Sequence, residues 1–283
     1  MKEAELAKKT ALITGCSAGG IGHSLATLLA GKGYRVLATV RNPAKAEALE
    51  DDAKSNGWDL RILQLDVRDD ASVAAAVAEA GHVDILVNNA GFEVWGPVEE
   101  ASIDDIKDQF ETNVFGSFRM IKAIVPGMRN RGDGIIINVS SVAGITGAPL
   151  NGLYASSKWA LEALSEALHF ELVHFGVRTH LIEPGPVETP FGANRRLVGA
   201  AAGKESPYAE LVTEWEKAGE RLNPGGAPTQ PEDVANVILE AIEVGDKLRY
   251  PVGQVTNLIV TARKAMSFEQ FESTMRAQLQ LTW

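Results

Sequence analysis

The sequence predicts an α/β fold with a single doubly wound parallel sheet flanked by helices. Short apolar runs alternate with amphipathic stretches of helical length, which is the pattern of successive βαβ units. The run over 134–139 holds three consecutive isoleucines and no charge, as is typical of a strand buried on both faces of a parallel sheet. The chain has 283 residues, 45% of them hydrophobic, so it can form a substantial core.

The first half of the chain predicts four strands with helices between them. Apolar residues at helical spacing predict a helix over 21–32. Pro43 is a favoured first-turn residue for the next helix, and an alanine-rich segment predicts another over 71–80. The segment 102–129 is expected to be one long, largely helical stretch. The four strands are expected at 11–13, 34–40, 60–65 and 83–87.

The second half predicts three more strands and a lid. The strands are expected at 134–139, 177–182 and 248–252, and the helices at 152–175 and 231–244. Residues 190–228 form an irregular or helical insertion, which we interpret as a substrate lid, and 254–283 form a helical tail. Because no linker, repeat or low-complexity tract divides the chain, we expect one catalytic domain over 1–283.

Composition excludes several classes of protein. The formal net charge of −10 disfavours binding to the phosphate backbone of nucleic acids. Cys16 is the single cysteine, so the chain forms no internal disulfide and no cysteine-based zinc site. His169 and His174 do not have the spacing of a metalloprotease motif, and we expect no metal. Without a signal-peptide pattern or an apolar span of ~18 residues, we expect a cytoplasmic protein that does not cross a membrane.

A glycine-rich turn follows the first predicted strand. It reads Thr14-Gly15-Cys16-Ser17-Ala18-Gly19-Gly20-Ile21-Gly22 and leads directly into a helix. Glycine lets a backbone approach a pyrophosphate closely, and the helix N-terminus attracts its negative charge. The position within a βαβ unit favours a dinucleotide site over an ordinary glycine turn. Cys16 lies in this turn, where a packing role is favoured over a redox role.

The residues after the second strand indicate which dinucleotide is preferred. An NAD site usually has an acidic residue ~20 residues after the glycines, but no Asp or Glu occurs from 15 to 46. Arg41 stands there instead, and a guanidinium can pair with the 2′-phosphate of NADP, with Lys45 and Ser17 assisting. The sequence therefore predicts NADP(H) in preference to NAD(H). A solvated loop arginine is the alternative.

Three polar side chains form a candidate catalytic set. Tyr154 and Lys158 are four residues apart and share one face of the predicted helix. A lysine near a phenol stabilises the phenolate and lowers the tyrosine pKa from ~10, which suits proton transfer near neutral pH. Ser141 ends the fifth predicted strand, at the sheet edge where ligands bind in doubly wound folds. Its hydroxyl can bond a substrate carbonyl, and a turn serine is the alternative.

In this order and spacing, the motifs resemble those of the short-chain dehydrogenase/reductase family over roughly 8–252. Two segments, 36–41 and 65–69, are most similar to the 17β-hydroxysteroid and retinol dehydrogenase branch, and carbonyl reductases share them. The resemblance implies a Rossmann-like fold. The motifs are the 14–22 turn, Leu65-Asp66-Val67, Asn88-Asn89-Ala90-Gly91, Thr112-Asn113-Val114, Ser140-Ser141, Tyr154 with Lys158, and the segment 184–189.

The resemblance implies a role for each matching residue. Tyr154 would be the general acid in reduction and the base in oxidation, while Ser141 would hold the carbonyl oxygen. Lys158 would bond the nicotinamide ribose and tune Tyr154, and Asn113 would anchor a water relay behind Lys158. The glycine turn has one residue more than the usual motif, so whether Gly19 or Gly20 faces the pyrophosphate stays open.

The resemblance also implies the cofactor contacts. Asp66 would bond the adenine amino group and Asn88 would lie beside the adenosine ribose. The segment around Val187 and Thr189 would contact the nicotinamide amide. The expected cofactor residues are Gly15, Ser17, Gly20, Ile21, Gly22, Arg41, Asp66, Val67, Asn88, Ala90, Tyr154, Lys158, Pro184, Val187 and Thr189.

The substrate pocket is expected to be largely apolar. The loop after the fourth strand and the lid supply aromatic and aliphatic side chains, which suit a hydrophobic ketone, aldehyde or secondary alcohol. Arg195 and Arg196 would bind an acidic group or remain solvated. The expected pocket residues are Phe92, Val94, Trp95, Ile145, Leu150 and Phe191.

The expected function is NADPH-dependent reduction of a ketone or aldehyde to an alcohol, and the reverse oxidation. One alternative keeps the enzyme but makes the substrate a 3-oxoacyl thioester. Another is a non-catalytic NADP(H)-binding sensor or scaffold, against which the Ser141, Tyr154 and Lys158 set argues. The resemblance further implies a homodimer or homotetramer that pairs the helices near 113–129 and 152–175.

Overall fold

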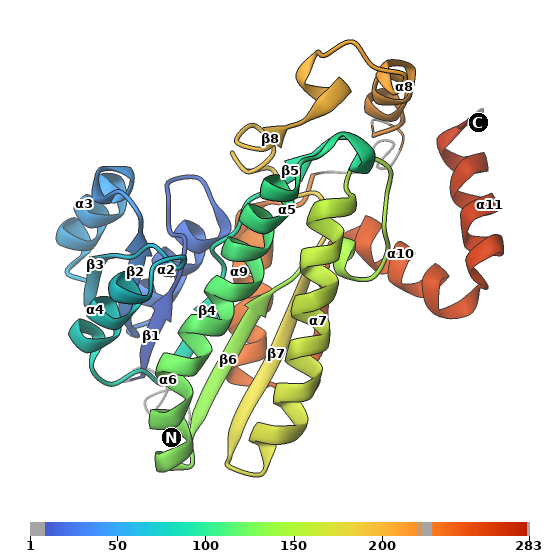
Figure 1. The fold of residues 1–283 in the computed structure, drawn as a ribbon. Helices are drawn as coiled ribbons and strands as arrows, with labels where there is room; N and C mark the ends of the chain where they lie inside the picture. The colour runs from blue at the N-terminus through green and yellow to red at the C-terminus, as the bar shows by residue number, and fades with distance from the viewer. Residues whose placement is uncertain (1–8, 220, 222–227, 282–283) are drawn as a thin grey trace.

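A seven-stranded parallel sheet forms the centre of the protein (Figure 1). The computed structural model describes residues 9–219, 221 and 228–281. The strand order is β3-β2-β1-β4-β6-β7-β9, so the winding reverses between β1 and β4. The predicted doubly wound sheet is therefore confirmed. The strands are β1 (Thr10–Ile13), β2 (Arg35–Val40), β3 (Leu60–Gln64), β4 (Ile85–Asn88), β6 (Gly134–Val139), β7 (Val177–Pro184) and β9 (Arg249–Val252).

Helices cover both faces of the sheet. Alternate side chains of a strand point to opposite faces, so Ile13 packs with one helical layer and Leu12 with the other. This is why the strands consist of uninterrupted apolar residues. Figure 1 shows α6 and α7 on the viewer's side of the sheet. One layer contains α2 (Ile21–Gly31), α3 (Glu47–Asn56) and α9 (Pro231–Glu243), and the other contains α4 (Asp70–Ala80), α6 (Ser117–Arg131) and α7 (Gly152–Val173).

The long helix expected over 102–129 is divided by a π-helical turn. Helix α5 (Ile103–Phe110) begins at a capping box, in which Ser102 Oγ accepts a hydrogen bond from the Asp105 amide at 3.1 Å. The π-helical turn η3 (Glu111–Gly116) then leads into α6. A π-turn adds a residue to one turn and often marks a functional site.

A small second sheet joins the loop after β4 to the predicted lid. Strand β5 (Val94–Trp95) pairs in parallel with β8 (Arg196–Leu197), and the sequence did not predict this pair. Helix α8 (Ala209–Gly219) follows, whereas 220 and 222–227, the last part of the predicted lid, lie outside the described residues. The short helical turns are η1 (Pro43–Ala46), η2 (Val98–Glu100), η4 (Val142–Gly144) and η5 (Gly199–Ala202).

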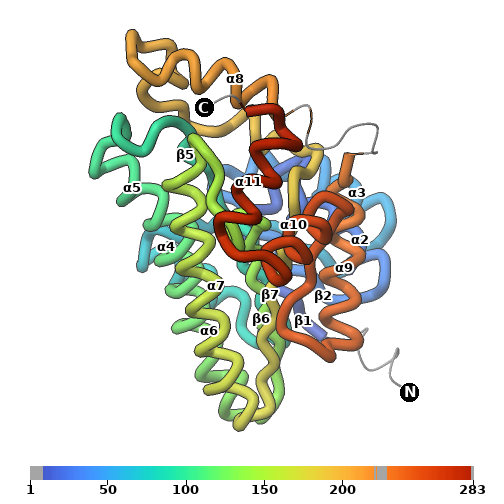
Figure 2. Tube along the Cα trace, turned by 90° about the vertical axis from the view of Figure 1, so that its right-hand side faces the viewer, coloured from blue at the N-terminus to red at the C-terminus, as the bar shows by residue number. Residues whose placement is uncertain are grey.

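The C-terminal segment forms two helices, α10 (Gln254–Ala265) and α11 (Phe268–Leu279). Figure 2 shows both in the foreground between α7 and α9. The Arg221 guanidinium donates a hydrogen bond to the Leu279 carbonyl at 2.7 Å, which ties the end of α11 to the segment after α8. Within the described ranges, no helix has the length and apolar character needed to cross a membrane.

Candidate active site

A cavity of about 1500 Å³ opens at the carboxyl ends of the strands. Its wall combines the glycine turn, the end of β2, the loops after β4, β6 and β7, and the C-terminal helices. In doubly wound folds, ligands bind where the strand order reverses, which is the position of this cavity. Pockets for a single small ligand measure about 300–1000 Å³. The larger volume here suits a dinucleotide together with a second molecule.

The glycine turn has the shape of a phosphate cradle. Gly15 has a φ of +75°, and a Cβ there would lie 2.9 Å from the Cα of Ala90. A Cβ on Gly22 would lie 2.7 Å from Asn89 Nδ2, so only glycine fits at either position. Gly20 lines the cavity as the N-cap of α2 and brings no side-chain cap, so the helix N-terminus stays open to an anion.

Two of the expected cofactor residues act behind the cavity wall. Gly22 allows the close packing just described, and Asn88 Nδ2 donates a hydrogen bond to Asn138 Oδ1 at 2.9 Å. Asn89, which sequence reasoning did not single out, ties the turn to β4 by donating from Nδ2 to the Thr14 and Gly15 carbonyls. The others line the cavity: Gly15, Ser17, Gly20, Ile21, Arg41, Asp66, Val67, Ala90, Tyr154, Lys158, Pro184, Val187 and Thr189.

The part of the cavity wall at the end of β2 carries a small net positive charge, from Arg41, Lys45 and Arg68 against Glu47 and Asp66. Arg41 and Lys45 line it beside Ser17. Asp66 holds Arg68 in the same wall through a 2.6 Å contact from Nη2 to Oδ2, and this hydrogen bond lowers the pKa of the Asp66 carboxyl. The Asp66 charge is thus partly balanced by Arg68.

Tyr154 and Lys158 lie next to each other on α7. The Lys158 Nζ atom is 5.6 Å from the Tyr154 ring centre and donates a hydrogen bond to the Val139 carbonyl at 2.8 Å. Burial lowers the pKa of Lys158 to about 8, although the charge of Glu162 opposes this fall. Lys158 is therefore mostly protonated at neutral pH and loses its proton as the pH rises above about 8.

The Tyr154 phenol does not have the lowered pKa that the sequence predicted. Burial raises its pKa, the Ser141 side chain lowers it in part, and the Glu93 charge raises it further. Desolvation is the largest of these effects, and it disfavours the phenolate. The phenol accordingly holds its proton until an acceptor arrives.

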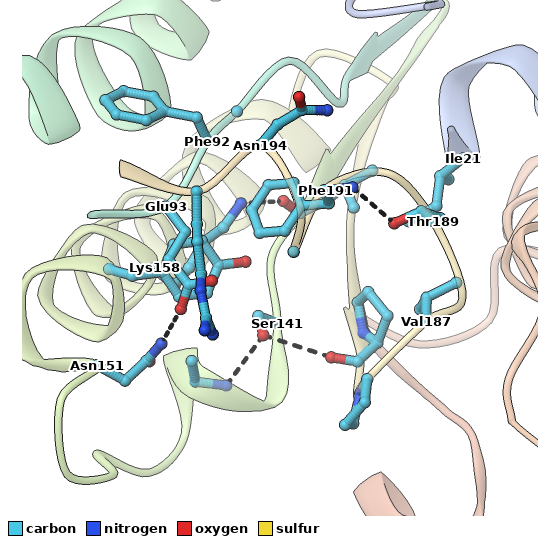
Figure 3. A pocket seen from close by; sticks show the side chains of 18 of the residues that line it. Ile21, Phe92, Glu93, Ser141, Asn151, Lys158, Val187, Thr189, Phe191 and Asn194 are labelled. Atoms are coloured by element: carbon cyan, nitrogen blue, oxygen red, sulfur yellow. Dashed lines mark hydrogen bonds between the residues drawn. The ribbon is translucent and has the colours of Figure 1, made fainter. Parts of the chain in front are cut away.

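Ser141 is held in place by backbone contacts at the end of β6. Its Oγ accepts a hydrogen bond from the Ala143 amide at 3.1 Å and donates to the Pro184 carbonyl at 3.4 Å (Figure 3). The Ser141 side chain is also close enough to Tyr154 to lower the pKa of the phenol in part. Ser141, Tyr154 and Lys158, the candidate catalytic set of the sequence analysis, thus lie together on one cavity wall.

Asn113 lies behind this wall, in the π-helical turn. It is 1% exposed, and its side chain pairs with both backbone groups of Phe92 at 3.1 and 3.0 Å. Its Nδ2 also donates a hydrogen bond to Ser157 Oγ at 3.1 Å. Asn113 therefore connects the loop after β4 to the helix that carries Tyr154 and Lys158.

Only part of the expected substrate pocket lies in the cavity wall. Phe92, Trp95 and Phe191 do, and the rings of Phe191 and Tyr154 are 5.7 Å apart. Val94 is buried with Leu153 instead, because neighbouring residues of β5 point in opposite directions. The other two expected pocket residues, Ile145 and Leu150, belong to the described part of the chain and do not line the cavity either.

Sequence reasoning missed several wall residues. Two of the polar ones are Glu93, which was not among the expected pocket residues, and Asn151; their side chains are hydrogen-bonded to each other. A group of apolar ones recurs at helical spacing in the C-terminal segment. This spacing predicts helices, but it does not indicate that they line the cavity. The residues of this group are Val255, Ile259, Phe268, Phe271, Met275 and Leu279.

The two arginines of the predicted lid are already partnered. The Arg195 guanidinium stacks 4.0 Å from the Trp95 ring centre and lies 3.7 Å from Glu216. Arg196 forms ion pairs with Asp105 and Asp108 of α5. Their charges therefore fasten the lid segment to its surroundings.

Cys16 packs in the core. It is fully buried, and burial raises the pKa of its thiol to about 12, which disfavours the reactive thiolate. Across the residues that the structure describes, no group of three His, Cys, Asp or Glu side chains is arranged to hold a metal ion.

Comparison with known proteins places the sequence among oxidoreductases. The chain is 36% identical to the uncharacterized oxidoreductase YusZ of Bacillus subtilis over 96% of this chain and 99% of that protein. Human retinol dehydrogenase 8 is 46% identical over 65% of this chain and 61% of that protein. Human 17-beta-hydroxysteroid dehydrogenase type 1 is 44% identical over 66% and 59%, respectively, so the chain matches under two thirds of these two human proteins.

Structure and family comparisons agree with these relatives. A gluconate 5-dehydrogenase from Burkholderia cenocepacia J2315, solved in complex with NADP and tartrate, superimposes with a TM-score of 0.74 at 26% identity, over 91% of this chain and 98% of that one. The short chain dehydrogenase family profile matches residues 9–197. The chain therefore belongs to the short-chain dehydrogenase/reductase family of nicotinamide-dependent oxidoreductases, close to the retinol and 17-beta-hydroxysteroid dehydrogenases.

Proposed function

We propose that the protein reduces a ketone or aldehyde to an alcohol with NADPH and catalyses the reverse oxidation. The observation that carries this proposal is the convergence of Ser141, Tyr154 and Lys158 on the cavity that also contains the glycine cradle. A site for binding alone would need the cradle but not a serine, tyrosine and lysine set suited to proton transfer. This argues against a sensor or scaffold.

The proposed chemistry divides between cofactor and protein. The nicotinamide, when bound, supplies or accepts a hydride. Ser141 Oγ holds the substrate carbonyl oxygen, and the Tyr154 phenol gives that oxygen its proton. The Lys158 ammonium stabilises the phenolate left behind, which opposes the effect of burial. In the oxidative direction, the Tyr154 phenolate takes the proton back.

The preference for NADP(H) rests on the charge at the end of β2. Arg41 and Lys45 line the groove where an adenosine 2′-phosphate would lie, beside the Ser17 hydroxyl. Charge-assisted hydrogen bonds from a guanidinium are well suited to a phosphate. NADP in the similar gluconate 5-dehydrogenase also supports this choice.

The wall around Tyr154 supports a substrate with substantial apolar surface. Phe92, Trp95 and Phe191 line it together with the apolar faces of α10 and α11. A thioester on a phosphorylated carrier would need unpaired cations at the entrance, yet Arg195 and Arg196 are engaged with carboxylates. A free carbonyl compound is therefore favoured over a 3-oxoacyl thioester.

The test is loss of reduced-nicotinamide absorbance with a panel of carbonyl compounds. Wild type should turn over with NADPH and more slowly with NADH. Tyr154→Phe should lose about 100-fold or more of the activity, while Tyr208→Phe, a control on a half-buried tyrosine outside the cavity wall, should keep it. Full activity in Tyr154→Phe would overturn the mechanism. Tight NADPH binding without turnover of any carbonyl compound would favour a sensor.

A further inference from the structure

Besides Ser141 and Lys158, a second polar pair lines the cavity near Tyr154. Glu93 and Asn151 both line the cavity, and Asn151 Nδ2 donates a hydrogen bond to Glu93 Oε1 (Figure 3). Glu93 precedes the first residue of β5, so it points to the same side as Trp95 and opposite to the buried Val94. The backbone therefore directs this carboxyl group into the substrate region.

The Asn151 side chain does not form the hydrogen bond that is common at its position in a helix. It is the N-cap of α7, where an asparagine side chain commonly accepts a hydrogen bond from the helix, yet it makes no capping bond. Its amide donates to Glu93 instead. The start of the helix that carries Tyr154 thus holds the Glu93 carboxyl in place.

The Glu93 carboxyl is close to the reacting groups. Its charge is near enough to Tyr154 to raise the pKa of the phenol. Burial raises the pKa of Glu93 itself, while the charge of Arg195 and the bond from Asn151 lower it. A half-buried carboxyl that faces a cavity is stabilised by a hydrogen-bond donor from the occupant.

From this arrangement we infer that the enzyme prefers carbonyl substrates bearing a hydroxyl group near the carbonyl carbon, which donates a hydrogen bond to Glu93. A hydroxyl fits better than an ammonium, because Arg195 already places positive charge beside this carboxyl. The apolar remainder of such a substrate lies against Phe191 and the C-terminal helices. This inference rests on the proposed carbonyl reduction.

The experiment compares four ketones that differ at one position. Cyclohexanone, 2-methylcyclohexanone, 2-methoxycyclohexanone and 2-hydroxycyclohexanone have similar shapes, but only the last donates a hydrogen bond. Wild type should show a kcat/KM for the hydroxyketone about 10- to 100-fold above that for the methyl and methoxy compounds, as expected of a hydrogen bond to a charged group.

Variants assign this preference to Glu93. Glu93→Leu should reduce the hydroxy-to-methyl ratio of kcat/KM at least about tenfold, while Glu93→Gln, which keeps an acceptor oxygen and the shape, should retain part of it. Glu272→Gln is the control, because Glu272 also lines the cavity but pairs with Arg276 on α11. Thermal unfolding of each variant separates a folding defect from a change in preference.

The outcomes distinguish this inference from the proposed function. If wild type reduces all four ketones equally, or if Glu93→Leu keeps the ratio, the role of Glu93 is wrong and carbonyl reduction still stands. If Glu93→Leu does not fold, an unchanged ratio in Glu93→Gln and in Asn151→Ala overturns the role. If wild type reduces none of these ketones and no compound of the wider carbonyl panel, the proposed function fails.

Discussion

Glu162 lies one helical turn beyond Lys158 on the buried face of α7, and its charge opposes the burial that lowers the pKa of Lys158. The Arg249 Nε atom contacts Glu162 Oε2 at 3.0 Å and Glu183 Oε1 at 3.1 Å. Glu183 is the second-last residue of β7, followed by the equally buried Pro184, which lines the cavity. A buried charge cluster on three elements therefore lies behind the proposed catalytic lysine.

The first prediction concerns pH and the Lys158–Glu162 pair. If charged Lys158 stabilises the Tyr154 phenolate as proposed, reduction should weaken as pH rises through the lysine pKa of about 8. Glu162→Gln removes a negative charge that favours the ammonium, so this pKa should fall and the decline should begin at lower pH. At pH 9 the variant's kcat/KM should be about three- to tenfold below that of wild type.

A pH profile of kcat/KM for both proteins makes this measurement. Glu166→Gln is a suitable control, because Glu166 also pairs with Arg249 but is exposed at the helix surface. A loss that is the same at every pH would indicate a structural role for Glu162 and contradict the electrostatic one.

A second prediction concerns stability and Glu183. Glu183 is 1% exposed, and burial raises its pKa from 4.5 to about 7. A carboxyl whose folded-state pKa is raised contributes its stability below the unfolded pKa and loses it as pH rises through the folded value. Glu183→Gln should therefore stabilise the fold by about 1–3 kcal/mol at pH 8 and have little effect near pH 4.5.

Denaturant unfolding at the two pH values tests this expectation. Glu171→Gln, on the exposed surface of α7, should change stability little at either pH. Destabilisation of Glu183→Gln at pH 8 would mean that the ion pair with Arg249 outweighs the cost of burying the charge.

The sheet and the position of the candidate catalytic residues on one cavity wall could be predicted because their signals are local. Strands buried on both faces produce continuous apolar runs, and Tyr154 and Lys158 are brought together by one helical turn. The break at Asn113 could not be predicted, because one extra residue in a turn hardly alters helical periodicity. Strands β5 and β8 have two residues each, too few to show alternation.

The cavity wall was harder to predict than the catalytic set. Whether Val94 or Glu93 faces the substrate depends on how β5 pairs with β8, about a hundred residues away in the chain. The apolar face of α11 has a clear pattern, but the pattern does not say what covers it. Contacts between distant segments therefore limit prediction of substrate specificity more than of chemistry.

A third prediction concerns cofactor choice. Arg41→Ala removes a cation from the groove where the 2′-phosphate is proposed to lie. The KM for NADPH should rise about 10- to 100-fold, since a charge-assisted hydrogen bond is lost. The KM for NADH should stay within about twofold of wild type, because NADH has no 2′-phosphate. Arg61→Ala, which removes an arginine paired with Glu79, should affect neither. Equal weakening of both cofactors would assign Arg41 a structural role.

The last prediction concerns assembly through α6 and α7. These helices lie side by side and expose aromatic side chains, with Phe118 44%, Trp159 48% and Phe170 77% exposed. Large exposed apolar surfaces often mark interfaces, and we expect a dimer or tetramer that covers these aromatic side chains.

The double variant Phe118→Glu with Trp159→Glu should place four charges in a two-fold interface and yield monomers by light scattering. Leu258→Glu on α10, an apolar site that is 62% exposed and does not belong to these helices, should leave assembly intact. If the double variant keeps the mass of the wild-type oligomer, the chain assembles through another surface. If the wild type is itself a monomer, these aromatic residues do not form an interface between copies of the chain.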